Sequence, residues 1–293
     1  ANTQLELFAD NKAVIKSKGR PKDSANKFII NEVGDINNDG QFNLEDVALQ
    51  LRANKNNEWA VLDEDGDFRS DECIELLKQS DIVVTNPPFS LFREYTNQLI
   101  EYDKNFIIIG NINAITYREV FPLLKDNKMW TGNRFNRRVG GKNMTFTVPD
   151  DYPLSGTEVE KDENGRKLIS VSGTGWYTNL EHGRRHEPLS LMTMKDNLKF
   201  NKKKLEGKNP YKKYYNYDAI EVPFTAAIPS NYKAMMGVPI SFLDKYNPDQ
   251  FIIIGASDNG AIEQIYKLPH FKSHNEPYIE EKKTYKRIFI KHK

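Results

Sequence analysis

Two continuous apolar runs dominate the hydrophobic pattern of this chain. Residues 82–85 are four β-branched residues in a row, and residues 106–109 form a second run without a polar interruption. Such runs are apolar on both faces, which is typical of strands buried on both sides in a parallel sheet. Apolar residues at helical spacing after Ser70 predict a helix that Ser70 caps. Two further helices are predicted at 92–102 and 117–128. This alternation of strand and helix predicts a doubly wound α/β core.

The pattern changes on both sides of this core. Short strands are expected at 27–33 and 60–62, and a helix at 44–52. Beyond residue 130, loops rich in Gly, Asn, Arg and Lys separate strand candidates at 144–148, 168–171, 175–178, 251–255 and 285–290. We therefore divide the chain into a polar N-terminal region with an Asp/Asn loop (1–59), the α/β core (60–148) and an appended region (149–293).

Composition narrows the class of protein. The 293 residues include 38% apolar side chains and a single Cys, and no run of about 18 apolar residues that could span a membrane. A disulfide scaffold and a membrane protein are excluded, the N-terminus lacks a signal-peptide pattern, and a cytoplasmic protein is expected. The formal net charge of +1 hides a division, because residues 1–100 carry 11 basic and 18 acidic side chains, and the rest carry 31 and 23. A nucleic-acid partner for the basic part is compatible with this total.

The strand at 82–85 leads directly into the tetrapeptide Asn86-Pro87-Pro88-Phe89. Ligands bind at the carboxyl ends of strands in open α/β sheets, so this is a favourable place for a site. The Asn oxygen and a backbone carbonyl can accept the two N–H groups of an exocyclic amine, which frees its lone pair for attack. The two prolines make the loop rigid, and Phe89 offers a face on which a base can stack. The alternative is a strand terminator followed by a core Phe.

The residues around this tetrapeptide resemble the EcoRI-type adenine-specific DNA methyltransferase family. The resemblance extends over nearly the whole chain. It is carried by GDFRS at 66–70, DIVVTNPPFSLFREY at 81–95, IIIGN at 107–111, NAITY at 113–117, WYTNL at 176–180, RHE at 185–187, NYDAI at 216–220, MGVPI at 236–240 and FLDKYNP at 242–248.

The resemblance implies a fold, a reaction and roles for individual residues. It implies a Rossmann-like core that depends on S-adenosylmethionine and an appended target-recognition region. The implied reaction is methylation of adenine N6 in double-stranded DNA, on a base flipped out of the duplex. Asn86 and Pro87 would bind the adenine amine, Phe89 would stack on the ring, and Asp67 and Phe68 would bind the adenine of the cofactor. A restriction–modification role, with a cognate restriction endonuclease as a partner, also follows from the family.

One part of the family pattern is missing. We find no glycine-containing cofactor loop in residues 1–66, and the later glycine turns at 171–175 and 251–256 lack the elements that must follow them. We therefore expect this chain alone to bind S-adenosylmethionine weakly or not at all. Two alternatives stay open beside the DNA adenine methyltransferase: a DNA-binding fragment without activity, and a methyltransferase of RNA bases or protein amides.

A Lys-rich segment with interleaved tyrosines supplies the candidate DNA contacts. Residues 183–215 hold ten basic and three acidic side chains. Basic side chains can neutralise phosphates, and tyrosines can stack or donate hydrogen bonds. For any single lysine, a solvated loop is the alternative. The candidates are Arg184, Arg185, Lys202, Lys203, Lys204, Lys212 and Lys213.

The loop at 35–46 has the ligand spacing of a calcium loop of the EF-hand or dockerin type. Its last ligand is Asp rather than Glu, and a strand rather than a helix precedes it, so we favour a plain Asp/Asn/Gly turn and assign no metal. His182 and His186 have helical spacing but no third ligand nearby, and Cys73 is expected in the core. The oxygen ligands of the loop would be Asp35, Asn37, Asp39, Asn43 and Asp46.

Overall fold

The computed structural model contains two compact units, Ala1–Ser80 and Asp81–Lys293. It describes residues 25–31, 34–40, 46–47, 49–50, 56–132, 138–139, 142–143, 145–148, 159–170, 173–201, 205, 210–257 and 276–293. Within this part of the chain, no helix is long and apolar enough to cross a membrane.

The first unit contains a two-stranded antiparallel sheet and one complete helix. Strand β1 (Asn26–Ile29) pairs with β2 (Glu58–Val61), close to the predicted strands. Helix α3 (Asp71–Gln79) begins where the sequence predicts, because the Ser70 hydroxyl accepts a hydrogen bond from the Cys73 backbone N–H at 3.3 Å. Cys73 itself is only partly buried, so the expectation of a core position is wrong.

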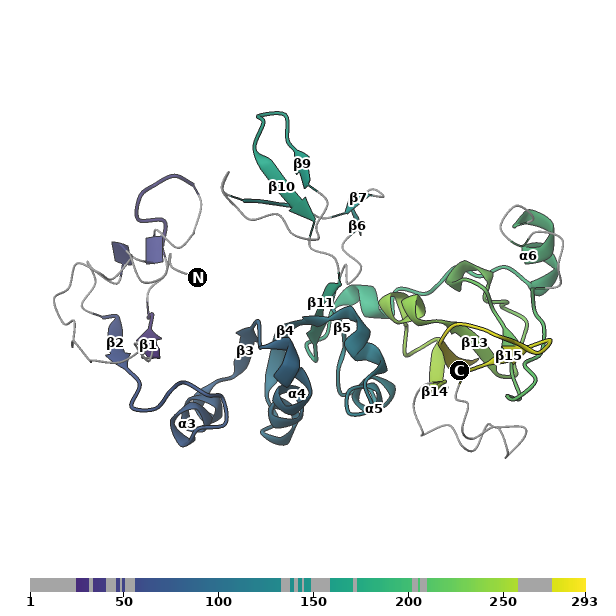
Figure 1. Ribbon diagram of the computed structural model, residues 1–293, viewed down its shortest axis with the longest axis horizontal. Coiled ribbons are helices and arrows are strands. Elements are labelled where there is room, and N and C mark those ends of the chain that lie inside the picture. The colour runs from purple at the N-terminus through teal and green to yellow at the C-terminus, as the bar shows by residue number, and fades with distance from the viewer. Residues whose placement is uncertain are drawn as a thin grey trace. The chain divides into compact units, whose positions relative to one another are not determined.

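The second unit begins with a mixed four-stranded sheet in the order β3-β4-β11-β5 (Figure 1). Strands β3 (Ile82–Thr85) and β4 (Asn105–Asn111) are parallel, and helix α4 (Phe92–Glu101) connects them. Strand β11 (Thr174–Thr178) runs antiparallel to β4 and to β5 (Trp130–Thr131). The strand–helix–strand unit predicted for the core is therefore present. The sheet also takes in β11, from beyond the boundary predicted at residue 148.

Close packing joins α4 to the middle of this sheet. Phe92 is 1% exposed and its ring lies 5.1 Å from that of Tyr177 on β11. Gly110 on β4 leaves room for the Phe92 ring, because a Cβ at this position would overlap three of its carbons. Phe106 and Ile108 of β4 are fully buried. The residue that opens α4 is thus fixed against two strands, and this fixes the turn that precedes it.

Two predictions for this region are wrong. Strand β3 is not buried on both faces, since Ile82 is 50% and Val84 is 66% exposed. The reason is its place at the edge of the sheet, where β4 is its only paired neighbour among the described strands. The helix predicted at 117–128 is shorter, because a 3₁₀ turn precedes it and α5 covers only Phe121–Lys125.

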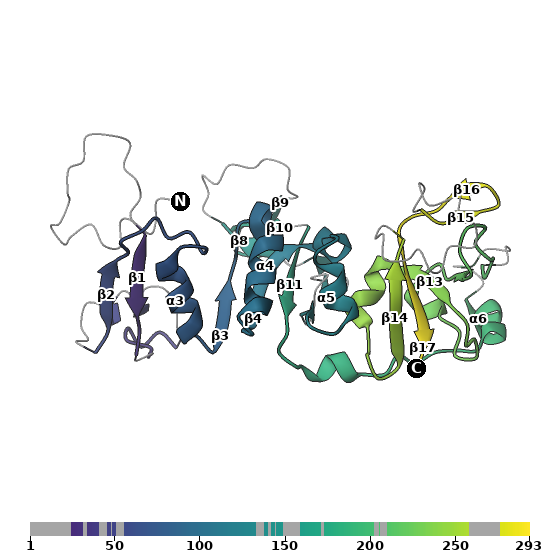
Figure 2. The same cartoon turned by 90° about the horizontal axis from the view of Figure 1, so that it is seen from below.

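The C-terminal part of this unit forms a second four-stranded sheet in the order β12-β13-β17-β14 (Figure 2). Its strands are β12 (Ile220–Glu221), β13 (Met236–Pro239), β14 (Phe251–Ala256) and β17 (Arg287–His292). Tyr214, Tyr217 and Phe289 pack together at its core. A small hairpin of β15 (Tyr278–Ile279) and β16 (Lys282–Lys283) precedes β17.

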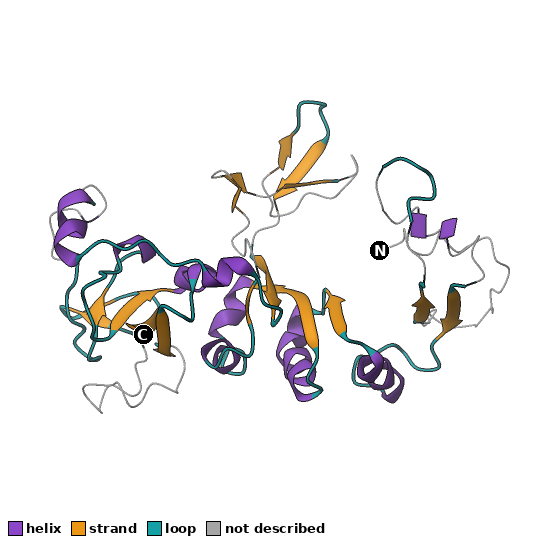
Figure 3. Ribbon diagram, turned by 180° about the vertical axis from the view of Figure 1, so that it is seen from behind, coloured by secondary structure: helices purple, strands orange, loops and turns teal. Residues whose placement is uncertain are grey.

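The remaining elements are short (Figure 3). Strands β8 (Thr145–Thr147), β10 (Lys167–Ser170) and β9 (Val159–Lys161) form a separate antiparallel sheet, and β6 (Arg138–Val139) pairs with β7 (Lys142–Asn143). Helix α6 spans Met194–Phe200. Short 3₁₀ helices cover Phe89–Leu91 (η1), Ile112–Thr116 (η2), Gly183–His186 (η3), Thr225–Ala227 (η4) and Ile240–Lys245 (η5).

Candidate active site

The tetrapeptide Asn86-Pro87-Pro88-Phe89 forms the turn between β3 and α4. Asn86 follows the last residue of β3 and is exposed, Pro87 is buried, and Phe89 is 40% exposed. The Leu91 backbone N–H donates to the Pro88 carbonyl at 2.9 Å and closes η1. Among the described residues, no hydrogen bond reaches the Asn86 amide or the Pro87 carbonyl. The turn therefore presents two acceptors and an aromatic ring on a rigid backbone.

The end of the neighbouring strand contributes to the same edge of the sheet. Asn111 ends β4, which runs parallel to β3, and its side-chain oxygen accepts from the Asn113 N–H at 2.8 Å. The Tyr177 hydroxyl donates to the Asn111 carbonyl at 2.8 Å. Burial raises the pKa of Tyr177, so this hydroxyl stays a donor. Sequence reasoning missed Tyr177, because a tyrosine 66 residues away from Asn111 gives no local signal.

A third contact joins the turns that follow the two strands. The Arg93 guanidinium at the start of α4 lies 3.7 Å from Glu119 and 5.7 Å from the centre of the Tyr117 ring. Tyr117 ends the 3₁₀ helix that follows β4. These are exposed contacts of small individual energy, and together they tie the α4 start to the loop after β4.

In the first unit, Asp67 forms a local cluster with Phe68 and Arg69. The Asp67 carboxylate accepts from the Arg69 backbone N–H at 2.9 Å and from its guanidinium at 2.7 and 2.9 Å. The hydrogen bond from the Arg69 side chain lowers the pKa of Asp67 to about 2. The guanidinium also lies 5.2 Å from the Phe68 ring centre. Asp67 is thus an ionised acceptor beside an aromatic ring at neutral pH, which fits an adenine amine.

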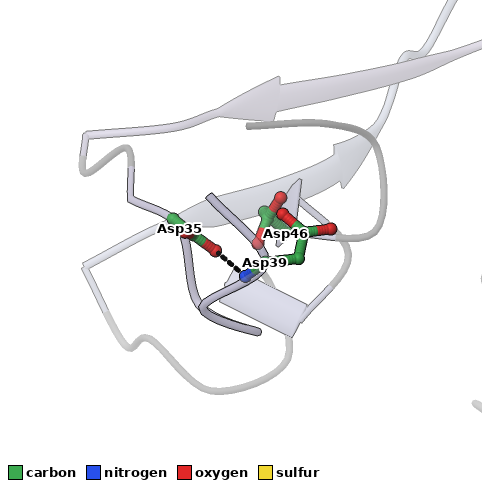
Figure 4. A group of neighbouring side chains, drawn as sticks. All are labelled: Asp35, Asp39 and Asp46. Carbon is green, nitrogen blue, oxygen red and sulfur yellow. Dashed lines mark hydrogen bonds between the residues drawn. The ribbon is translucent and has the colours of Figure 1, made fainter. Parts of the chain in front are cut away.

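The acidic loop of the first unit brings three carboxylates together, as Figure 4 shows. Oxygen atoms of Asp35, Asp39 and Asp46 all lie within 4.8 Å of one another. Backbone N–H groups already bind two of them: Asp35 accepts from Asp39 and Gly40, and Asp46 accepts from Ile36 and Asn37. These hydrogen bonds are typical of an Asp/Asn/Gly turn, and the assignment of no metal to the loop stays a prediction. Asn43 lies outside the described residues.

The structure corrects the prediction for Arg185. Its side chain is only 7% exposed and its guanidinium lies 3.8 Å from the centre of the Trp130 ring. It also pairs with Glu181 and donates to Asn127 at 2.6 Å. These contacts join η3 to the sheet, so Arg185 is a structural residue rather than a phosphate contact.

The other predicted DNA contacts differ in their surroundings. Arg184 is 34% exposed with Asp244 at 3.9 Å. Lys212 pairs with Glu280, and Lys213 is exposed. Lys202, Lys203 and Lys204 lie outside the described residues. Of the exposed cations predicted in this stretch, Lys213 is therefore the best placed for a partner among those described.

The expectation that the tyrosines of this stretch bind nucleic acid is wrong for three of them. Tyr211, Tyr214 and Tyr217 are 6%, 1% and 1% exposed. Tyr214 and Tyr217 pack on Phe289, and the Tyr211 hydroxyl donates to the Ala227 carbonyl at 2.8 Å. Only Tyr215, at 53%, is exposed. The alternation of lysine and tyrosine in residues 211–217 is therefore typical of a surface segment that packs most of its tyrosines into the core and leaves its lysines toward solvent.

His186 forms hydrogen bonds with two carboxylates. Its ring nitrogens lie 2.6 Å from Asp249 and 3.0 Å from Glu181. The hydrogen bond to Asp249 is the largest cause that raises the pKa of His186, and the hydrogen bond to Glu181 is the next. The same His186–Asp249 hydrogen bond lowers the pKa of Asp249. The imidazolium form is therefore the one that links η3 to the segment before β14.

This link predicts a pH dependence of stability. A raised pKa in the folded protein contributes stability below the unfolded value of about 6.5, and this contribution is lost as the pH rises through the folded pKa. We expect the unfolding midpoint of the wild type to fall more than that of His186→Gln between about pH 6 and pH 9. Urea titrations at several pH values measure this. Parallel curves for the two proteins would contradict it.

Comparisons with known proteins identify a family and several relatives. The sequence profile of the family described as adenine-specific methyltransferase EcoRI matches residues 6–293. The type II methyltransferase M.EcoRI of Escherichia coli is 53% identical over 190 residues, which are 65% of this chain and 54% of that protein. Type II methyltransferases of Mycoplasma genitalium and Mycoplasma pneumoniae are 38% and 35% identical over 235 residues, covering 77% of this chain and 69% and 68% of theirs. No solved structure matches. The chain thus spans about half the length of M.EcoRI.

Proposed function

Since this chain belongs to the adenine-specific methyltransferase EcoRI family, we propose that it transfers a methyl group from S-adenosylmethionine to N6 of adenine in double-stranded DNA, in a type II restriction–modification system. The observation that carries the proposal is the turn after β3. It presents the Asn86 amide and the Pro87 carbonyl, with an exposed Phe89, at the carboxyl end of a strand in a parallel pair.

In the proposed reaction, this turn positions the nucleophile. The Asn86 oxygen and the Pro87 carbonyl accept the two N–H groups of the flipped adenine, and the Phe89 ring stacks on the base. The amine nitrogen then directs its lone pair away from the ring and attacks the methyl carbon. A methyl group bound to a sulfonium would supply the electrophile, and the excess N6 proton would pass to water. Positioning supplies the catalysis, so no charged base is needed before transfer.

The cofactor supplies an electrophilic methyl group on a sulfonium when it is bound. In this proposal Asp67 accepts the amine of the cofactor adenine, and Phe68 contacts its ring. The hydrogen bonds from Arg69 orient the Asp67 carboxylate for this role, and they lower its pKa to about 2. The Rossmann-like doubly wound core belongs to the same proposal, with β3, α4 and β4 as one of its units.

The proposal also includes the surroundings of the reaction. DNA is the partner of the basic part of the chain, with Arg184, Lys213 and the lysines at 202–204 as candidate phosphate contacts. A cognate restriction endonuclease would cleave the unmethylated site. DNA and S-adenosylmethionine meet in the cytoplasm, which is the proposed location.

Identification of the methylated product tests the proposal. The chain is incubated with isotopically labelled S-adenosylmethionine and DNA from a strain without methyltransferases, and the DNA is digested to nucleosides for mass spectrometry. Because we expect this chain alone to bind the cofactor weakly, the assay uses saturating S-adenosylmethionine, and we expect label in N6-methyl-2′-deoxyadenosine. Label that appears instead in RNA or in protein amides, supplied in parallel reactions, would contradict the proposal. Tight duplex binding with no label at saturating cofactor would favour the DNA-binding fragment.

A further inference from the structure

A buried ion pair fixes the backbone just before β17. Arg287 is 9% exposed and Glu221 is 8% exposed, and the guanidinium donates to the carboxylate at 2.6 and 3.0 Å. The same guanidinium donates to the carbonyls of Lys286 at 3.1 Å and Tyr285 at 3.3 Å. A buried charge pair is costly to desolvate and adds little net stability. Here it holds the carbonyls of two consecutive residues in place.

The hairpin before these residues is equally constrained. Ile279 pairs with Lys282, which leaves Glu280 and Glu281 as a two-residue turn. Both turn residues have positive φ, at 49° and 64°, as a primed hairpin turn requires. This conformation is unfavourable for a side chain other than Gly or Asn, and such backbone strain gathers at functional segments. Ile279 packs on the core cluster of Tyr214, Tyr217 and Phe289, so the hairpin is anchored at its base.

One large aromatic side chain is displayed by this rigid segment. Tyr285 is 85% exposed, more than any other large apolar side chain in the part of the chain described here. Its backbone is held by Arg287 on one side, and on the other by Thr284, whose N–H donates to the Pro277 carbonyl at 2.7 Å. Because the backbone that carries the ring is already fixed, binding of a partner orders only the Tyr285 side chain.

Exposed lysines lie on the same hydrogen-bonded unit. The Tyr215 N–H donates to the Tyr278 carbonyl at 2.8 Å, and Asn216 bonds both Glu276 and Tyr278. Residues 212–216 are thereby joined to the hairpin that leads to Tyr285. Lys213 and Lys282 are both exposed on this unit. Figure 2 shows the hairpin extending away from the four-stranded sheet.

We propose that Tyr285, Lys213 and Lys282 form a docking surface for double-stranded DNA, which we name the hairpin surface. The lysines bind backbone phosphates, and the Tyr285 ring stacks on a base or sugar that the bound duplex exposes. Arg287 is a positioning residue, because it holds the backbone that carries the ring. This inference rests on the proposed function and specifies where part of the DNA binds.

Charge and chemistry favour DNA as the occupant. An anionic polymer fits exposed lysines on the same hydrogen-bonded unit as an exposed aromatic ring, and stacking on an aromatic is independent of sequence. The turn itself carries Glu280 and Glu281, and Lys212 pairs with Glu280. The phosphate contacts are therefore expected beside the turn rather than at its tip. Glu281→Lys should consequently increase non-specific affinity.

Salt titrations of duplex binding separate the two kinds of contact. Fluorescence anisotropy with the whole chain and labelled duplex DNA, without cofactor, gives Kd at several salt concentrations. We expect Tyr285→Ala to weaken binding about tenfold at every salt concentration, and Tyr285→Phe to bind like the wild type, because stacking needs only the ring. Lys213→Ala with Lys282→Ala should weaken binding and reduce the salt slope by about 1 to 2.

Ile252→Ala is the matched control. Ile252 is 45% exposed on β14, which pairs with β17 and lies outside the hairpin surface. Loss of its side chain should leave the Kd for duplex DNA unchanged. Circular dichroism and thermal melting confirm that each variant is folded. Tyr285→Ala and the lysine pair binding like the wild type would overturn the inference while leaving the proposed function intact. A wild-type chain that binds no duplex at all would contradict both.

Discussion

Asn86→Ala is expected to reduce methyl transfer to DNA by about 100- to 1,000-fold, the order of magnitude for removal of one preorganised hydrogen-bonding group at a reacting centre. The exposed Asn86 amide is one of two acceptors on the turn after β3, and the Pro87 carbonyl alone would leave one adenine N–H unbound. The amine would then stay conjugated with its ring. Single-turnover methylation with labelled cofactor measures the transfer step, apart from product release.

Two further variants make this result specific. Asn86→Asp keeps an oxygen acceptor at the same place, so it should retain more activity than the alanine variant. Asn97→Ala removes an exposed amide from α4, outside the turn, and should have wild-type activity. Duplex affinity should change little in all three proteins. Equal loss in the alanine and aspartate variants, or full activity without Asn86, would exclude the acceptor role.

The local elements could be predicted because their causes are local. The Ser70 cap, the β-branched run at residues 82–85 and the two prolines act over a few residues, and the structure places α3, β3 and the turn where they indicate. The parallel pairing of β3 with β4 could also be predicted, because a single crossover helix, α4, connects the two strands.

Properties that depend on distant residues could not be predicted in this way. Ile82 and Val84 are apolar whether β3 is central or at an edge, and only the strand order decides their burial. Arg185 and Lys213 are both cations in a basic stretch, yet Trp130 and Asn127 draw the first into the interior. The Asn111–Tyr177 contact lies between strands far apart in sequence. Charge and aromatic content thus indicated a partner, whereas packing determined which side chains remain to meet it.

The buried pair of Glu221 and Arg287 belongs to the same class of long-range features, and it is where we expect the largest loss of stability. The residues are 66 apart in sequence, and the Tyr214 hydroxyl also donates to Glu221. Burial opposes the charge on Arg287, but the hydrogen bonds and charge of Glu221 outweigh it and raise the pKa of Arg287. The guanidinium is thus charged in the interior, where the Glu221 carboxylate balances its charge.

Glu221→Ala should lower the free energy of unfolding by about 3–5 kcal/mol, because it leaves the Arg287 charge buried without compensation and removes the nearer of the two acceptors of the Tyr214 hydroxyl. Urea denaturation followed by tryptophan fluorescence measures this, since Trp130 and Trp176 lie in the same unit. Glu119→Gln breaks the exposed Arg93 pair of that unit and should cost less than about 1 kcal/mol.

Replacing both partners, as Glu221→Leu with Arg287→Met, should recover part of the loss, since no charge then remains buried. A Glu221→Ala effect as small as that of Glu119→Gln would show that water reaches the pair, and Arg287 would then not hold the Tyr285 backbone as the hairpin surface requires.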